Sequence, residues 1–131
     1  MSVSVVYLDS SAFVKLVVPE AESAALRRWL RNWPDRASCA LLRVEVVRAV
    51  MPSGPKAVRT ARWQMARLNV IELNRTLLDS AASLPVPLRS LDAIHLAAAQ
   101  SLGSDLGAVV TYDQRMANAA TTMGVVVQSP T

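Results

Sequence analysis

Five short apolar segments, rich in β-branched residues, alternate along this chain with longer segments of helical periodicity. The predicted strands are Val3–Leu8, Ala37–Cys39, Val70–Leu73, Ala108–Thr111 and Val125–Val127. This alternation is typical of parallel strands, because a parallel neighbour is reached only by a crossover, usually helical. Right-handed crossovers then favour a doubly wound α/β sheet with helices on both faces. At 131 residues, the chain is expected to form a single domain over 1–131.

Two helices in the first half of the chain are predicted to carry tryptophans. The segment Glu20–Trp33, with Pro19 at its first helical position, has one apolar stripe: Leu26, Trp29, Leu30 and Trp33. A second helix is predicted over Pro55–Leu68, where Trp63 falls on the basic face opposite the apolar residues. Such a tryptophan is not expected in the core of its own chain. It either contacts a protein partner or a nucleic-acid base, or lies flat beneath arginine side chains.

Two further helices are predicted nearer the C-terminus. Ser90 is expected to be the N-cap of a helix through Ala99 that stops by Gly103, and Asp113–Met123 is the last helix, ended by Gly124.

Composition excludes several classes of protein. The single Cys39 allows no intrachain disulfide, which fits a reducing cytoplasm. The first apolar run is too short for a secretion signal, and no run of 18 apolar residues predicts a membrane span. The net charge of +4 suits a polyanionic partner. However, Arg outnumbers Lys by 12 to 2 and Ala is abundant, a bias that GC-rich coding alone would produce. The charge therefore does not decide whether the partner is a nucleic acid.

Four carboxylates lie where acidic residues are out of place. They follow predicted strands or interrupt and open apolar helical segments: Asp9, Glu45, Asp92 and Asp113. They are four of only ten acidic residues in the chain, and carboxylates are rarely buried unless they are paired or bind a metal ion. Four converging carboxylates would repel one another, and a hard divalent cation is the natural remedy.

The predicted topology explains how these acids would meet. Ligands of doubly wound sheets bind beyond the carboxyl ends of the strands, where the strand order reverses. Asp9 ends the first predicted strand and Asp113 follows the fourth, so they share one crevice if those strands are neighbours. Glu45 and Asp92 would reach the same crevice from helices.

Each acid also has an ordinary structural explanation. Asp113 is able to cap the last helix, and Asp92 to complement the dipole of its own helix. Glu45 is placed to pair with Arg48 on one helix face, and Asp9 to accept hydrogen bonds from nearby backbone amides. The joint placement of the four at strand ends and helix starts favours a shared site over four separate explanations.

The residues that several other kinds of catalytic or binding site require are missing from this sequence. His95, the only histidine, is expected to be a hydrogen-bonded core residue, and one His with one Cys cannot build a zinc site. The four glycines are scattered, so there is no phosphate-binding loop, and no G-x-S-x-G elbow supports a serine hydrolase. A dehalogenase-type phosphatase would need a second Asp where this chain has Ser11, and a receiver domain would need one after the third predicted strand, at Leu73-Asn74.

Four motifs resemble those of the PIN-domain ribonucleases, in particular the VapC toxins of bacterial toxin–antitoxin pairs. The matching segments are Tyr7-Leu-Asp-Ser-Ser-Ala12, Leu42-Arg-Val-Glu-Val-Val47, Ser90-Leu-Asp-Ala-Ile-His-Leu-Ala97 and Val110-Thr-Tyr-Asp-Gln-Arg-Met116. Their order and spacing match over Val3 to Val127, and none of the four acidic positions departs from the family pattern.

The resemblance implies a three-layer PIN-like fold with a five-stranded parallel sheet flanked by helices. It implies a Mg²⁺ or Mn²⁺ site formed by Asp9, Glu45, Asp92 and Asp113, with Asp9 and Asp92 the most direct ligands and Asp113 the most variable. Hydroxyls that orient these acids would come from Ser10 or Ser11 and from Thr111. It further implies a homodimer that a VapB-like antitoxin neutralises, in a heterotetramer or larger assembly. Candidate partner-surface residues are Trp29, Trp33 and Trp63.

The expected activity is metal-dependent endonucleolytic hydrolysis of RNA by a metal-activated water, leaving a 5′-phosphate and a 3′-hydroxyl. The alternative is a non-catalytic RNA- or protein-binding module on the same fold. The RNA target, the number of metal ions, cleavage of DNA and the identity of the antitoxin all stay open on the sequence alone.

Overall fold

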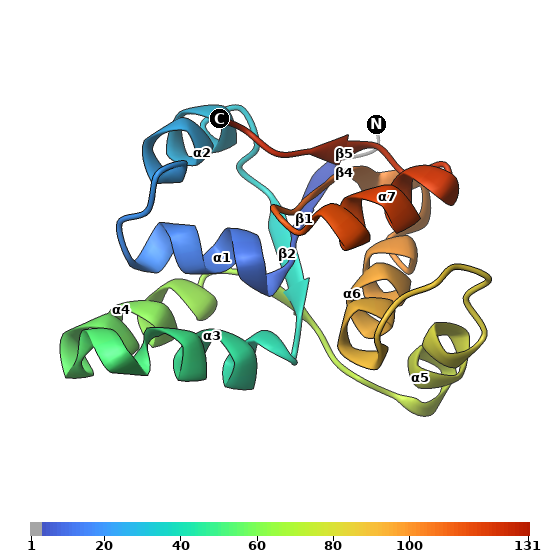
Figure 1. Ribbon diagram of the computed structural model, residues 1–131, viewed down its shortest axis with the longest axis horizontal. Helices are drawn as coiled ribbons and strands as arrows, with labels where there is room; N and C mark the ends of the chain where they lie inside the picture. The colour runs from blue at the N-terminus through green and yellow to red at the C-terminus, as the bar shows by residue number, and fades with distance from the viewer. Residues whose placement is uncertain (1–3) are drawn as a thin grey trace.

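The computed structural model describes residues 4–131 and contains one five-stranded parallel sheet of order β3-β2-β1-β4-β5 (Figure 1). The strands are β1 (Val5–Leu8), β2 (Arg36–Cys39), β3 (Asn69–Ile71), β4 (Leu106–Val110) and β5 (Val127–Gln128). The predicted five-stranded parallel sheet is therefore confirmed, with strand limits that differ from the prediction by at most two residues. Val3, which the sequence placed in the first strand, lies outside the described residues.

Helices cover both faces of the sheet, with α1–α4 on one side and α5–α7 on the other (Figure 1). Their bounds are α1 (Ser10–Val17), α2 (Ser23–Leu30), α3 (Leu42–Val50), α4 (Pro55–Met65), α5 (Arg75–Ala82), α6 (Ser90–Gln100) and α7 (Gln114–Thr122). Two short 3₁₀ turns, Met51–Ser53 and Gly103–Asp105, join α3 to α4 and α6 to β4. The chain moves from β1 to β3 in one direction and then jumps back to β4. Right-handed crossovers in opposite directions place their helices on opposite faces.

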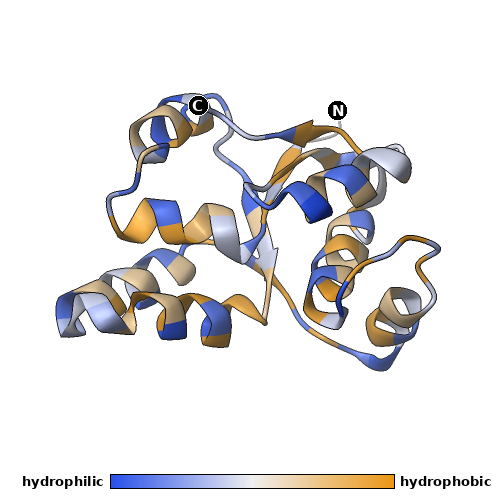
Figure 2. Cartoon of the chain, viewed as in Figure 1, coloured by the Kyte–Doolittle hydropathy of each residue, from blue (hydrophilic) through white to orange (hydrophobic). Residues whose placement is uncertain are grey.

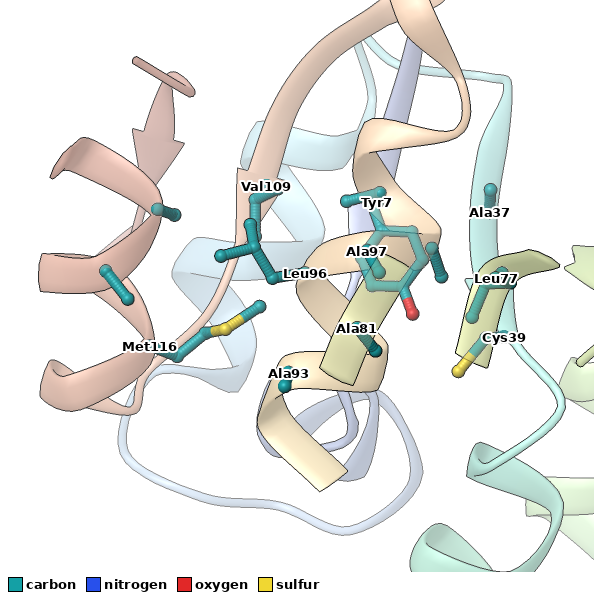
Figure 3. Packing of buried hydrophobic residues seen from close by; sticks show 14 residues of the cluster. Tyr7, Ala37, Cys39, Leu77, Ala81, Ala93, Leu96, Ala97, Val109 and Met116 are labelled. Atoms are coloured by element: carbon teal, nitrogen blue, oxygen red, sulfur yellow. The ribbon is translucent and has the colours of Figure 1, made fainter. Parts of the chain in front are cut away.

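Side-chain alternation along the strands produces two cores. Tyr7 and Val109 pack with α5–α7, whereas Val6 and Leu8 pack with α1–α4, because successive strand residues point to opposite faces. Figure 3 shows the first cluster, in which Tyr7 lies beside Ala97 of α6. Figure 2 shows hydrophilic residues on the side of α3 that faces away from α1; Glu45 is an exception, because it accepts a hydrogen bond from Ser10 of α1. The chain thus folds into the three layers that its sequence predicted.

The predicted start of the second helix was wrong. The helix α2 begins at Ser23, and Pro19 lies in the connection from α1. The Ser23 hydroxyl accepts a hydrogen bond from the amide of Glu20 and closes a turn there, while Lys15 of α1 binds both Glu20 and Glu22. A contact with the preceding helix therefore holds the two glutamates that seemed to belong to the first helical turn.

Helix ends also differ from expectation around α4 and α6. Helix α4 ends at Met65 rather than at the predicted Leu68, which lies in the turn that follows. The N-cap of α6 is Arg89, whose backbone is extended, and Ser90 is its first helical residue rather than its cap. The amide of Ala93 bonds to the carbonyl of Arg89 at 2.9 Å, which closes the first turn one residue earlier than predicted. Asp92 is consequently the third residue of α6.

The strand order reverses between β1 and β4, which pair in parallel with Tyr7 opposite Val109 and Leu8 opposite Val110. The region beyond their carboxyl ends is where doubly wound folds place ligands. This pairing brings the residues after Leu8 next to those after Val110, although about a hundred positions separate them in the chain.

Candidate active site at the carboxyl edge of the sheet

Asp9 is the innermost of the four acids, with 4% of its surface exposed. It is the N-cap of α1 and accepts a 3.0 Å hydrogen bond from the amide of Ala12. The hydroxyl of Ser11 donates to Oδ1 at 2.6 Å, and the hydroxyl of Thr111 donates to Oδ2 at 2.5 Å. Burial raises the pKa of Asp9, and these three hydrogen bonds oppose that rise. Asp9 is therefore a helix cap and, at the same time, a carboxylate held firmly at the strand end.

Glu45 reaches the same edge from the first turn of α3. Its Oε1 accepts hydrogen bonds from the Ser10 hydroxyl at 2.8 Å and from Nε2 of His95 at 2.7 Å. Burial favours a higher pKa for Glu45, but the bonds from His95 and Ser10 outweigh it and lower the pKa. The partners of Glu45 are thus residues of α1 and α6, rather than Arg48 on its own helix.

Asp92 projects from the first turn of α6 and is the acid with the weakest protein support. Within residues 4–131, its one ion pair is a 3.7 Å contact with Arg89, whose side chain is 70% exposed. Such a pair adds little to stability. Burial raises the pKa of Asp92, and the nearby charge of Asp113 raises it further. The Asp92 carboxylate is accordingly placed near another carboxylate without enough hydrogen bonds to compensate.

Asp113 is the N-cap of α7, as one structural explanation predicted. Its Oδ1 accepts from the amides of Arg115 at 2.8 Å and Met116 at 3.4 Å. Its own amide donates to the Thr111 hydroxyl at 3.1 Å. The same Thr111 side chain therefore touches both Asp9 and Asp113, which joins the ends of β1 and β4 into one polar unit.

The four acids fit a hard cation by chemistry, although they do not form a closed cage. Their donors are all oxygen, the set that Mg²⁺ and Mn²⁺ prefer. The mutual repulsion at Asp92, with Asp113 and Glu45 both raising its pKa, is what a divalent cation would relieve. Within residues 4–131, no three His, Cys, Asp or Glu side chains are close enough to hold a metal ion as they stand. Binding would therefore require side-chain movement, most easily of Asp92, which is partly exposed and has few protein contacts.

His95 is buried and hydrogen-bonded, as the sequence predicted for a lone histidine in an apolar helix. Its link to Glu45 was not predicted. Burial opposes a charge on His95, but contacts with Cys39 and Glu45 outweigh it and raise its pKa to about 10. The signal in the sequence was the i, i+3 spacing of Asp92 and His95, which places both on one side of α6.

The three tryptophans occupy different environments. Trp29 and Trp33 stack on each other, with ring centroids 5.4 Å apart, and both are partly buried against the core on the α1–α4 side. Trp63 is 63% exposed, and the guanidinium of Arg67 lies 4.8 Å from its ring centroid. The predicted exposure of Trp63 is confirmed, together with the arginine contact that was the alternative to a partner surface.

A groove of roughly 480 Å³ lies between α1, α2 and α4 beside Trp63. Its lining is mixed apolar and basic and includes Phe13, Leu16, Arg27, Arg36, Trp63 and Arg67. Among the helices in residues 4–131, none is long and apolar enough to cross a membrane.

Residues 6–121 match the model of the PIN domain family. The chain therefore belongs to the PIN-domain family, as a member of its VapC group. It is 52% identical over 126 residues to Ribonuclease VapC46 of Mycobacterium tuberculosis strain ATCC 25618 / H37Rv, covering 95% of this chain and 97% of that protein. It is 42% identical over 130 residues to Ribonuclease VapC35 of the same strain, covering 95% and 96%.

Solved structures show the same fold at low sequence identity. Mycobacterium tuberculosis VapC20, described as a sarcin-ricin loop cleaving toxin, superposes with a TM-score of 0.74 at 16% identity, over 95% of this chain and 99% of that one. A chain of a toxin–antitoxin complex from Klebsiella pneumoniae also gives 0.74 at 20% identity, over 96% and 98%. These likenesses confirm the three-layer PIN-like fold.

Proposed function

We propose that this protein is a Mg²⁺- or Mn²⁺-dependent endoribonuclease and the toxin of a type II toxin–antitoxin pair. The observation that carries the proposal is the group of carboxylates at the β1–β4 switch point, where Asp9, Glu45, Asp92 and Asp113 come from four different segments. Its ribonuclease relatives at 52% and 42% identity support this assignment.

Within this proposal the four acids hold the cation, with Asp9 and Asp92 as the most direct ligands. When bound, the cation supplies positive charge that activates water for in-line attack and neutralises the leaving oxygen. Ser11 and Thr111 fix the Asp9 carboxylate, and Ser10 fixes Glu45, so that neither acid has to be ordered when substrate arrives. The expected products carry a 5′-phosphate and a 3′-hydroxyl.

Arginines beside the acids are placed to hold the flanking phosphates of an RNA strand. Arg43, Arg89 and Arg115 are exposed and lie within three residues of Glu45, Asp92 and Asp113, respectively. Phosphate contacts of this kind hold a strand without reading its sequence. An RNA substrate and the unpaired Cys39 both fit a protein of the cytoplasm.

The groove beside Trp63 is the proposed binding surface for the antitoxin. Its aromatic and apolar lining suits an amphipathic helix, and Arg27, Arg36 and Arg67 would bind acidic residues of the same partner. Chains of solved VapBC structures from Rickettsia felis and nontypeable Haemophilus influenzae share this fold, at TM-scores of 0.74 and 0.66. A homodimer is the expected state of the free toxin, and light scattering after size exclusion would measure it.

The decisive test is cleavage of total cellular RNA by purified, antitoxin-free protein, with and without Mn²⁺ or Mg²⁺, beside the Asp9→Asn variant. Discrete fragments that need the metal and disappear in the variant would establish the activity and identify the target. A folded protein that leaves RNA intact under every metal condition would instead favour a non-catalytic binding module. Fragments ending in a 2′,3′-cyclic phosphate would count against a metal-activated water.

A further inference from the structure

Both ring nitrogens of His95 are engaged by side chains from other elements of the fold. Nε2 lies 2.7 Å from Oε1 of Glu45 in α3, and Nδ1 lies 2.7 Å from the hydroxyl of Tyr7 in β1. The Cys39 sulfur in β2 is a third, longer contact at 3.7 Å from Nδ1. His95 and Tyr7 are 2% and 0% exposed, so this arrangement is enclosed by the core, whereas the side chain of Glu45 is partly exposed. Figure 3 shows the Tyr7 hydroxyl directed toward the side of the cluster where Cys39 lies.

The direction of these hydrogen bonds follows from the groups themselves. An ionised carboxylate only accepts, so Nε2 of His95 carries a hydrogen and donates it to Glu45. In the charged ring Nδ1 also carries a hydrogen and donates it to the Tyr7 hydroxyl oxygen, whereas in the neutral ring Nδ1 accepts from that hydroxyl; Nε2 donates to Glu45 in either state. The result is a series of hydrogen bonds that links Tyr7, His95 and Glu45.

These hydrogen bonds engage only one of the two carboxylate oxygens of Glu45. His95 and Ser10 both bind Oε1, and within residues 4–131 no protein donor binds Oε2. Two donors on one carboxylate oxygen fix the rotation of the carboxylate and thereby the direction of the other oxygen. If His95 served only to hydrogen-bond the buried hydroxyl of Tyr7, its contact with Glu45 would not be needed.

We propose that His95 is a positioning residue, which through its hydrogen bonds to Tyr7 and Glu45 directs Oε2 of Glu45 toward the other acids at the carboxyl edge of the sheet. This inference rests on the proposed function, since it assigns Glu45 to the cation and substrate side of the site. It adds a residue from the core of the sheet to a site otherwise built from residues at its edge. His95 itself does not touch substrate; its effect passes through Glu45.

A matched pair of variants separates positioning from filling of the core. The amide nitrogen of a glutamine reaches about as far as Nε2 of histidine, whereas that of an asparagine reaches only about as far as Nδ1. His95→Gln therefore keeps a donor for Glu45, and His95→Asn keeps only a partner for Tyr7. The measurements are Mn²⁺ affinity of the antitoxin-free chain by calorimetry and the single-turnover rate constant of RNA cleavage.

We expect His95→Asn to weaken Mn²⁺ binding and cleavage by about 10- to 100-fold, the usual cost of losing a group that orients a metal-binding residue. His95→Gln should recover most of that loss. In a Glu45→Gln background His95→Asn should cost less than about 2-fold, because residues acting through one another are not additive. Equal losses in the two His95 variants, or full additivity with Glu45→Gln, would overturn the proposal.

Two controls separate the positioning role of His95 from a loss of folding and from a failure of the proposed function. If both His95 variants unfold, Tyr7→Phe takes their place, because it removes only the hydroxyl that fixes the His95 ring. A smaller loss of Mn²⁺ affinity than in His95→Asn is expected, and an unchanged affinity would count against the positioning role. Wild-type protein that binds Mn²⁺ but cleaves no RNA would refute the ribonuclease. The affinities of the His95 variants would still decide whether His95 positions Glu45.

Discussion

The hydroxyl of Thr111 donates a 2.5 Å hydrogen bond to Oδ2 of Asp9, across 102 positions of sequence. Thr111 is fully buried, follows the last residue of β4, and also accepts from the amide of Asp113. Asp9 follows β1, the parallel neighbour of β4. One hydroxyl therefore ties together the two strand ends at the switch point and sets the position of the most buried acid.

Replacing Thr111 by valine should separate this hydrogen bond from packing, because the two side chains have nearly the same shape. We expect Thr111→Val to lower RNA cleavage about 10- to 100-fold. The protein should stay folded with a loss of about 1–2 kcal/mol. The matched control is Thr122→Val, an exposed position whose hydroxyl donates to the carbonyl of Asn118. Kinetics and thermal unfolding of both variants check the prediction, and unchanged cleavage by Thr111→Val would contradict it.

Asp9→Asn should abolish cleavage and yet stabilise the metal-free protein. Burial raises the pKa of Asp9, so the folded state binds this proton more tightly than the unfolded chain does. The charged carboxylate thus costs stability above its folded-state pKa, and the cost disappears as the pH falls toward the ordinary value of 3.8. The gain in melting temperature of the variant should be largest near about pH 7 and shrink toward about pH 4. A gain that grows on acidification would contradict this sign.

Mn²⁺ or Mg²⁺ should raise the melting temperature of the wild type. A ligand that binds only the folded state adds RT ln(1 + [L]/Kd), about 2.7 kcal/mol at a concentration of 100 Kd. The shift should vanish or shrink in Asp9→Asn and Asp92→Asn. Asp105→Asn is the control, because Asp105 is exposed and directly precedes β4, at the opposite edge of the sheet. An equal metal shift in all these variants would place the cation elsewhere.

Trp63→Ala should weaken antitoxin binding by at least about 2 kcal/mol while leaving the stability of the free toxin nearly unchanged. The reason is its exposure of 63% together with its place at the rim of the groove. Val126→Ala, at an exposed apolar position outside the groove lining, is the control. Titration of the co-purified antitoxin against each variant measures the effect. Wild-type affinity in Trp63→Ala would remove this surface from the interface.

Gly107→Ala should destabilise the fold by about 1–3 kcal/mol, as expected when an atom is forced into a packed contact. A Cβ at Gly107 would lie 2.5 Å from the Trp33 ring, which is stacked on Trp29. Ser104→Ala, on the exposed turn before β4, should be close to neutral. Denaturant unfolding compares the two, and equal midpoints would show that the Trp33 ring moves aside at little cost.

The limits of sequence reasoning are visible in particular residues. The cap of α6 was placed one residue late, since Ser90 is the better capping residue by type, but the backbone turns at Arg89. The helix expected from Pro19 begins at Ser23, because Lys15 of α1 binds the glutamates between them. In both cases contacts beyond the local segment decided where the helix begins.

The sequence by itself determined the alternation of strands and helices, the parallel sheet and the position of Asp9 and Asp113 at its carboxyl edge. Those properties follow from local periodicity and from the end of each strand, which are written in neighbouring residues. Only the tertiary structure decided that Thr111 holds Asp9 and that the lone histidine joins Tyr7 to Glu45. The partners in those contacts are 102, 88 and 50 positions apart. The pairing of distant side chains depends on strand order and helix packing, and no local sequence pattern encodes either of these.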